Sequence, residues 1–356
     1  MKLMNTAGIL ACAVALIFVP QNQQANAQCL ADVNLDHQVN AIDLAAVLSA
    51  WATNGSSNGT DFNNDGFVNG SDLAFIVSSW GQCPAVVPEW ATLLEAVPDP
   101  AVVTDANLRA AIVVSGFAWR IRDNSSGIEM LLIPGGTFNM GCSASNSYDC
   151  DGDESPTHQV TLSKAFYLGK TEVTQAQWQA KMGSNPSYFQ PPNYTLDTSR
   201  PVEKVSWNDI AGFNTATGLR LPTEAEWEYA CRGTTTTAFH SMLGYPNGTN
   251  DDSLFGNIAW DYNNSENQTH SVAGKAANAF GLYDMSGNVW EWCNDWYQIY
   301  AAGNATDPAG PATGTHCVKR GGGWISYSFG GRSSNRSDDR PDEDSYDDGF
   351  RVARTP

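Results

Sequence analysis

The chain falls into three stretches that differ in how hydrophobic and polar positions follow one another. An apolar run from Gly8 to Val19 comes after a short positive start. Two similar segments then combine polar loops with short apolar helices, and from Ile128 onward short apolar runs are separated by Gly, Asn and Pro. This pattern predicts an export signal, a small helical domain and a loop-rich α+β domain, in that order.

The N-terminal apolar run is predicted to belong to a signal peptide over residues 1–27. Ala25-Asn26-Ala27 has the small-x-small pattern of a cleavage site, so we expect cleavage after Ala27. The alternative is a lipid anchor on Cys29, although Gln28 is bulkier than the small residue that such a site requires. No later stretch reaches the roughly 20 apolar residues of a membrane span. We therefore expect a secreted or cell-surface protein without a membrane span.

Polar residues in the helical region repeat with a fixed spacing. Asp32, Asn34, Asp36, Gln38, Asn40 and Asp43 recur 29 residues later as Asp61, Asn63, Asp65, Phe67, Asn69 and Asp72. This is the ligand spacing of an EF-hand calcium loop, in which the middle residue contributes its backbone carbonyl. The six acidic residues between Leu30 and Cys83 all stand at ligand positions, which favours calcium binding over ordinary surface solvation. One apolar helix is predicted after each loop, at residues 44–51 and 73–80.

A calcium loop followed by a single helix, duplicated within residues 29–83, resembles a type I dockerin. The resemblance implies a small all-α domain that holds two calcium ions, folds only with them, and docks onto a cohesin-like receptor. His37 stands in the first loop where Gly66 stands in the second. The helix-start pairs Ala41-Ile42 and Gly70-Ser71 lack the hydroxyl pair usual for cohesin contact, so the receptor's identity stays open.

Residues 84–125 are predicted to be a linker. They contain four prolines and two short helical runs, at 90–95 and 105–114. In the alternative interpretation, an apolar face formed by Leu108, Ile112, Val113 and Trp119 docks on the following domain.

Charge and cysteine content narrow the possible functions. With 19 Lys and Arg against 38 Asp and Glu, the net charge is −19, which argues against a nucleic-acid partner because phosphates require a basic surface. Export makes disulfides the default state of the cysteines. The expected pairs are Cys29–Cys83, Cys142–Cys150 and Cys293–Cys317. Cys231 is then left over on a predicted helix, either as a buried thiol or as a catalytic one.

The C-terminal domain carries seven sequence blocks in a fixed order. Its predicted elements are a strand at 165–170 and helices near 174–181, 208–216 and 223–231, the last with a Thr223/Glu226 capping box. The blocks are 130–141, 170–174, 201–207, 220–230, 281–292, 320–324 and 349–351. They resemble the formylglycine-generating enzyme, or sulfatase-modifying factor, family over residues 126–354. The resemblance implies an α+β, C-type-lectin-like fold with little regular secondary structure.

The same resemblance bears on catalysis. Oxidases of this family convert a sulfatase cysteine to formylglycine with copper(I) and oxygen, using two thiolates. Ser326 and Gly331 stand where those thiols should be, which implies no catalytic residue and argues against copper. A secreted, calcium-stabilised binding module is the function we expect. Two alternatives stay open, namely an active formylglycine-generating oxidase and a different enzyme on the same fold.

The resemblance also implies one or two calcium ions in the C-terminal domain. One site would use Asn288, Glu291 and the backbone oxygens of Val289 and Cys293, and the other begins at Asn257-Ile258. In the alternative, Asn288 and Glu291 only cap buried backbone groups. A pocket for a peptide or glycan ligand is expected from aromatic and basic residues, which could equally form the core and rim of the fold. The pocket candidates are Trp290, Trp324, Ser326, Tyr327, Arg332 and Arg336.

Overall fold

The computed structural model describes residues 30–356 except 35–36, 55–58 and 143–149. The chain divides into two compact units, Met1–Val86 and Val87–Pro356. The predicted signal peptide, Cys29 and the predicted ligand Asp36 lie outside the described residues. In the described ranges, no helix has the length and apolar character needed to cross a membrane.

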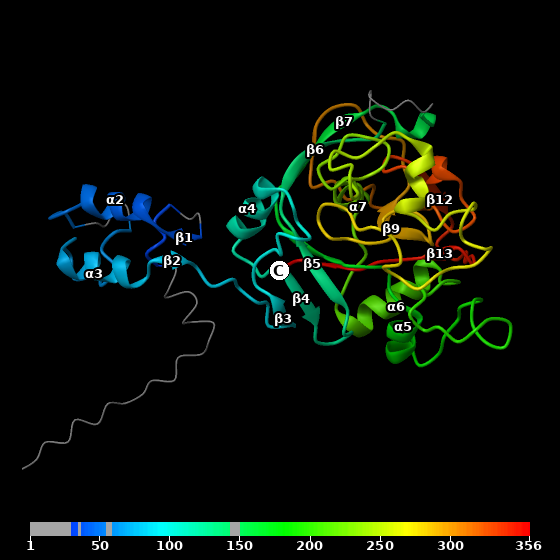
Figure 1. The fold of residues 1–356 in the computed structure, drawn as a ribbon, viewed down its shortest axis with the longest axis horizontal. Coiled ribbons are helices and arrows are strands. Elements are labelled where there is room, and N and C mark those ends of the chain that lie inside the picture. Colours follow the sequence, from blue (N-terminus) through cyan, green and yellow to red (C-terminus); the bar gives the residue numbers. More distant parts are fainter. Residues whose placement is uncertain (1–29, 35–36, 55–58, 143–149) are drawn as a thin grey trace, which may run out of the picture. The chain divides into compact units, whose positions relative to one another are not determined.

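The first unit contains the duplicated loop and helix (Figure 1). Its helices are α2 (Ala41–Ser49) and α3 (Gly70–Ser78), and its short antiparallel ribbon joins β1 (Gln38–Val39) to β2 (Gly81–Gln82). Asn40 and Asn69 are the N-caps, and the last acidic residue of each loop closes a capping box. Both predicted helices are confirmed. Each begins three residues earlier than expected, because the final loop ligand already belongs to the first helical turn.

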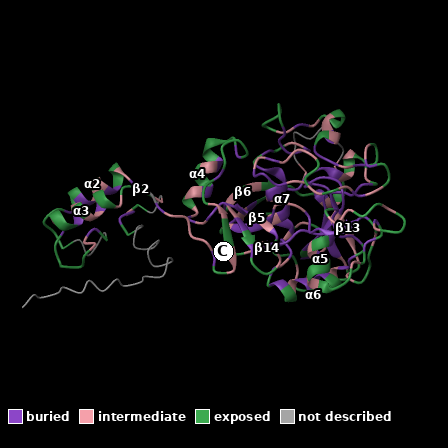
Figure 2. Cartoon of the chain, turned by 60° about the horizontal axis from the view of Figure 1, so that its bottom comes forward, coloured by how far each residue is buried: buried purple, intermediate pink, exposed green. Residues whose placement is uncertain are grey.

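The main sheet of the second unit has five antiparallel strands in the order β14-β8-β5-β4-β3. They are β3 (Ala91–Glu95), β4 (Arg120–Asp123), β5 (Glu129–Ile133), β8 (Phe166–Gly169) and β14 (Ala353–Arg354). The central strands β5 and β8 are almost entirely buried, which fits their continuous apolar sequence. Figure 2 shows buried positions concentrated around β5, α7 and β13, with exposed faces on α5 and α6.

The segment expected to be a linker is largely part of this unit. The run at 90–95 is strand β3 and not a helix, because it pairs with β4 and Glu95 forms an ion pair with Arg120 (2.5 Å). The second predicted helix is confirmed as α4 (Ala106–Val114). Leu108, Ile112 and Trp119 are buried, so the apolar face docks as the alternative interpretation expected.

Two smaller sheets and three helices complete the unit. One sheet joins β6 (Gly136–Met140), β7 (His158–Leu162) and β10 (Ala305–Thr306), and the other joins β12 (Arg336–Asp339), β11 (Cys317–Arg320), β9 (Trp290–Trp296) and β13 (Asp348–Gly349). The helices α5 (Gln175–Met182), α6 (Trp207–Thr217) and α7 (Glu224–Arg232) lie where they were predicted, and each begins at a capping box. Short 3-10 turns are η1 (Gly152–Glu154), η2 (Asp252–Asn257) and η3 (Ser328–Gly331). The predicted α+β fold with little regular secondary structure is confirmed.

The cysteine pairing differs from the expectation at one place. The Cys142 and Cys150 sulfurs lie at disulfide distance, with Cα atoms 5.9 Å apart, and Cys83 is disulfide-bonded. The expected Cys293–Cys317 pair does not form. Strands β9 and β11 are neighbours, but Cys317 lies opposite Trp296 and the register shifts beside it, so both thiols stay free and buried.

Candidate functional site

In the two loops of the first unit, backbone N–H groups hold the carboxylates of the predicted calcium ligands in place. In the second loop Asp61 accepts the Asp65 and Gly66 N–H groups (3.2 and 2.9 Å), and Asp72 accepts those of Phe62 and Asn69 (2.8 and 2.9 Å). These bonds orient the carboxylates and leave oxygen lone pairs for a cation.

The first loop is built in the same way. Asp32 accepts the His37 N–H (2.7 Å), and Asp43 accepts those of Val33 and Asn40 (2.8 and 2.9 Å). His37 adopts φ 61°, in the same left-handed region as Gly66 in the second loop (φ 89°), so the turn forms without glycine. Asp43 and Asp72 are fully buried, and residues 30–83 contain no Lys or Arg. A divalent cation would supply the missing counter-charge, so these residues fit calcium.

The stretch expected to carry copper-binding thiols has a different chemistry. The Ser326 hydroxyl accepts the Gly323 N–H (3.0 Å), and the Ser326 N–H donates to the Gly323 carbonyl (2.9 Å). A side chain at Gly331 would overlap Cζ of Phe255 and lie 2.6 Å from its Cε2. The ring of Phe255, which is buried, therefore occupies the volume of the second thiol.

Other thiols of the described chain do not replace the missing pair. Burial raises the pKa of Cys231 to about 11 and that of Cys317 to about 12, and it raises the pKa of Cys293 well above the usual range. Cys231 Sγ lies 3.5 Å from the Ser333 hydroxyl and the Met285 carbonyl. Copper(I) binds thiolates, and in the absence of a metal these buried groups remain thiols near neutral pH. Because neither Ser326 nor Gly331 supplies a thiol, the stretch that contains them does not fit a copper centre.

Three of the predicted calcium ligands at and just before the start of β9, namely Asn288, Glu291 and Cys293, bind protein groups. Glu291 pairs with Arg351 at 2.5 and 2.6 Å and also accepts the indole N–H of Trp227 (2.7 Å). Asn288 Oδ1 accepts the His270 N–H (2.9 Å). The Cys293 carbonyl accepts the Trp207 indole N–H (3.0 Å), and the Val289 N–H donates to Glu172 (3.1 Å). Asn288 therefore caps a backbone N–H group, as the alternative expected, whereas Glu291 binds the side chains of Arg351 and Trp227. At the other predicted site, the Asn257 carbonyl accepts the Ala276 N–H (3.1 Å), and Ile258 is buried.

Sequence reasoning missed two carboxylates beside Glu291. Burial, reinforced by the charge of Asp284, raises the pKa of Glu172 well above its usual range, and burial raises that of Asp284 to about 6. Arg351 is the cation that faces all three carboxylates. Glu172 and Asp284 stand inside two of the seven blocks, but 112 positions of sequence separate them, and only the fold brings them together.

A second cluster forms an aromatic pocket. Its cavity, about 340 Å³, is lined by Tyr188, Phe189, Tyr194, Asn267, Trp324 and Tyr346. Trp324 packs edge-on against Phe189 (5.4 Å between ring centroids), and its indole N–H donates to the Tyr346 carbonyl (3.1 Å). Tyr188 and Tyr346 are each about half exposed, at 48% and 45%. Of this lining, only Trp324 was among the predicted pocket residues.

The floor of the aromatic pocket is fixed by Glu203. Its buried carboxylate accepts the N–H groups of Tyr188 (2.9 Å) and Phe189 (3.0 Å), and burial raises its pKa to about 7. The predicted residue Tyr327 packs against Tyr262 with the two rings tilted and their centroids 4.7 Å apart, and both rings are exposed. Trp324, Ser326 and Tyr327 thus belong to one loop, which contributes Trp324 to the aromatic pocket and Tyr327 to the ring pair with Tyr262.

The predicted arginines lie away from this pocket lining. Arg332 is buried and pairs with Glu154 at 2.6 and 2.8 Å. Arg336 is buried and pairs with Glu224 at 2.6 and 2.9 Å. Trp290, on β9, is half-buried. An anionic ligand in the aromatic pocket would therefore lack the guanidinium partners that the sequence suggested.

Each of the two units matches a known protein family. Residues 120–356 match the model of the sulfatase-modifying factor enzyme 1-like domain, and residues 30–78 match the dockerin type I domain. The chain is 32% identical over 276 residues to a formylglycine-generating enzyme of Streptomyces coelicolor, covering 62% of this chain and 87% of the relative. It is 34% identical over 250 residues to the serine/threonine-protein kinase pkn1 of Chlamydia caviae, covering 64% of this chain and 38% of the kinase.

Two solved structures share the fold of the second unit. Treponema denticola variable protein 1 aligns with a TM-score of 0.56 and 31% identity, covering 64% of this chain and 95% of that protein. PvdO from Pseudomonas aeruginosa aligns with a TM-score of 0.56 and 27% identity, covering 67% of this chain and 98% of that protein. The domain thus occurs in proteins whose names point to several different roles.

Proposed function

Because the chain belongs to the sulfatase-modifying factor enzyme 1-like family through residues 120–356 and carries a type I dockerin at residues 30–78, we propose that it is an exported, dockerin-bearing binding protein without formylglycine-generating oxidase activity. The observation that carries this proposal is the loss of both thiol positions. Ser326 offers a hydroxyl already bonded to Gly323, and Phe255 fills the space beside Gly331. Neither group binds copper(I) or transfers an electron to oxygen.

In this proposal the dockerin attaches the protein to a receptor. Dockerin type I domains bind calcium and cohesins, and we propose two calcium ions and a cohesin-like receptor for this one. The buried, uncompensated Asp43 and Asp72 support the two ions. Apolar side chains that remain exposed on and after the two helices suit a receptor surface. They are Ile42, Leu48, Trp51, Val77 and Trp80. Attachment to an extracellular or cell-surface assembly agrees with the predicted signal peptide.

The aromatic pocket supplies the recognition surface. Rings such as Tyr188 and Tyr346 offer stacking area to a sugar face or to an apolar peptide side chain. Because no Lys or Arg among the described residues lines this pocket, we propose a neutral glycan or a neutral peptide as its ligand. Calcium in the second unit is not part of this proposal.

The test of the missing oxidase activity is direct. The mature protein, with calcium, copper and oxygen, is incubated with a peptide carrying the sulfatase-type Cys-x-Pro-x-Arg motif, and the peptide is then analysed by mass spectrometry. The formylglycine-generating enzyme of Streptomyces coelicolor serves as the positive control. We expect no conversion of the cysteine. Formylglycine in the sample would refute the proposal and make the protein a sulfatase activator.

The binding role needs its own test. Glycan and peptide arrays are screened with the protein and with a Tyr346→Ala variant, and any ligand found is titrated calorimetrically. Tyr245→Ala is the matched control, because Tyr245 is equally exposed (43% against 45%) and does not line the aromatic pocket. We expect Tyr346→Ala to weaken binding about tenfold, in line with the loss of one aromatic contact. Equal losses in the two variants would place the ligand elsewhere.

A further inference from the structure

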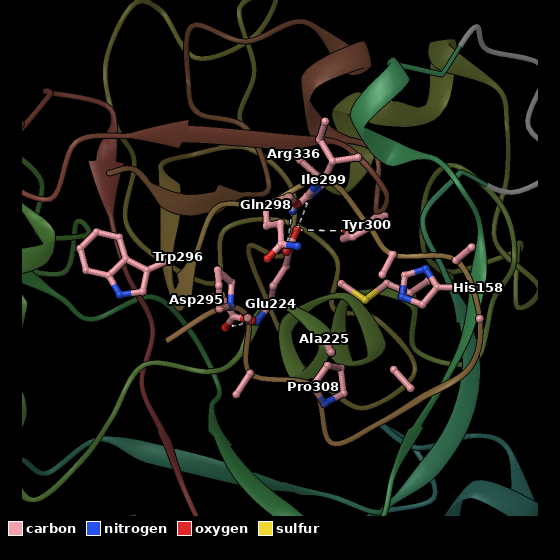
Figure 3. Close-up of a pocket in the computed structure, with 18 of the residues that line it drawn as sticks. His158, Glu224, Ala225, Asp295, Trp296, Gln298, Ile299, Tyr300, Pro308 and Arg336 are labelled. Atoms are coloured by element: carbon pink, nitrogen blue, oxygen red, sulfur yellow. Dashed lines mark hydrogen bonds and ion pairs between the residues drawn. The ribbon is translucent and has the colours of Figure 1, made fainter. Parts of the chain in front are cut away.

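A second cavity lies apart from the aromatic pocket, between α7, β7 and the segment that follows β9 (Figure 3). Its volume is about 320 Å³, which suits a small molecule. Most of its wall is apolar. Side chains of this kind include Met140, Ala225, Ile299, Ala305, Pro308 and Pro311.

One wall carries a carboxyl group that is nearly without partners. Asp295 is 5% exposed, and its Oδ2 accepts the Glu224 N–H (2.9 Å). In the part of the chain that the structure describes, no donor bonds to Oδ1, and no Lys, Arg or His nitrogen lies within 4.0 Å of the carboxylate. A buried carboxylate without a counter-cation is costly, so this group favours an incoming cation.

The other two charged groups of the cavity, Glu224 and Arg336, already neutralise each other. Glu224 pairs with Arg336 and also accepts the Tyr300 hydroxyl (3.1 Å). Arg336 makes two further bonds, to the Asp153 and Gln298 carbonyls (3.0 Å each). Figure 3 shows Glu224 between Arg336 and Tyr300, with Asp295 beside the Glu224 backbone. The carboxyl group of this cavity that lacks a cationic partner is therefore Asp295, and when ionised it would repel an anionic ligand.

We propose that this cavity binds a primary ammonium group carried on a short apolar chain, with the Asp295 carboxylate as its counter-ion. The apolar wall takes the chain, and the ring of Tyr300, which lines the cavity, adds a favourable surface for a cation. This site is independent of the aromatic pocket and of the proposed lack of oxidase activity.

Three probes of equal chain length test the proposal on the full mature protein at pH 9, where the Asp295 carboxyl group, whose pKa burial raises to about 8, is ionised and the amine is still protonated. They are n-hexylamine, n-hexanol and hexanoate, each titrated by calorimetry with calcium present. We expect the amine to bind about tenfold or more tightly than the alcohol, as one ion pair would give, and hexanoate not to bind. Equal affinity for amine and alcohol would overturn the proposal, and so would the absence of amine binding.

A matched pair of variants locates the site. Asp295→Asn keeps an acceptor for the Glu224 N–H and removes the charge, so we expect it to lower the affinity for hexylamine about tenfold. Asp252→Asn removes the same charge from an exposed position outside the cavity and should leave the affinity unchanged. Unchanged amine binding in Asp295→Asn would overturn the proposal. Should that variant fail to fold, the comparison of the three probes on the unmodified protein still decides.

Discussion

Replacing Gly331 with cysteine, the residue expected there in an oxidase of this family, should destabilise the second unit. The new Cβ would overlap Phe255 Cζ and lie 2.6 and 3.3 Å from Cε2 and Cε1, where carbon atoms pack best at about 3.5–4.0 Å. The Phe255 ring is 2% exposed and packs at 4.9 Å against Phe239, so it has little room to move. Overpacking of this kind costs about 1–3 kcal/mol of unfolding free energy.

Removing the ring should relieve the clash. Phe255→Ala alone is expected to cost about 3–5 kcal/mol, because it leaves a cavity in the core. In the Phe255→Ala/Gly331→Cys double variant the cysteine fills part of that cavity. The total loss should therefore be smaller than the sum of the single losses by about 0.5–3 kcal/mol.

Urea unfolding followed by tryptophan fluorescence measures these free energies, with calcium and reductant held constant. Additive losses, or a Gly331→Cys variant as stable as the unmodified protein, would refute the argument that Phe255 occupies the thiol's volume.

Four further results are expected. Removing calcium with a chelator should unfold residues 30–83 before the rest, and unchanged circular dichroism and hydrogen exchange would contradict this. Arg351→Leu should cost about 3–5 kcal/mol because buried carboxylates lose their cation, and urea unfolding that shows no loss would contradict it. Burial raises the pKa of the Asp295 carboxyl group to about 8, so between about pH 4 and 8 this group carries a proton in the folded protein but not in the unfolded one. The free energy of unfolding should therefore fall as the pH rises through this range. Urea unfolding between pH 5 and 9 should show a weaker pH dependence in Asp295→Asn. Alkylation of the unfolded, unreduced protein should label three thiols, Cys231, Cys293 and Cys317, and mass spectrometry that finds only one would contradict the free Cys293 and Cys317.

Local sequence patterns predicted the parts of the protein that local interactions determine. The calcium loops follow from ligand spacing within twelve residues, and α7 follows from a capping box that spans four. Strand β3 was missed because the run at 90–95 is compatible with either conformation. Its pairing with β4, whose sequence lies about 25 residues further on, decides the outcome.

The site was less predictable because its contacts are long-range. Arg332 and Glu154 are 178 positions apart, and Arg336 and Glu224 are 112 apart. Sequence alone does not tell a buried, paired arginine from one free to bind a ligand. Tyr188 and Tyr346 were missed for the same reason, since only the fold brings them to Trp324. The Cys293–Cys317 prediction failed on a register shift that no local pattern signals.

The buried arginines affect which substitutions the stretch between them can accept. Arg320, Arg332 and Arg336 bracket the stretch 324–331, and each is anchored by an ion pair to a glutamate in another element. The glutamates are Glu228, Glu154 and Glu224. Because both ends of the stretch are held by groups outside it, a change of side chain within 324–331 leaves these three ion pairs in place. Each new side chain must still fit its neighbours, as Gly331 beside Phe255 shows. The groups that hold this stretch in the fold are therefore different from the groups within it that would give it a chemical activity.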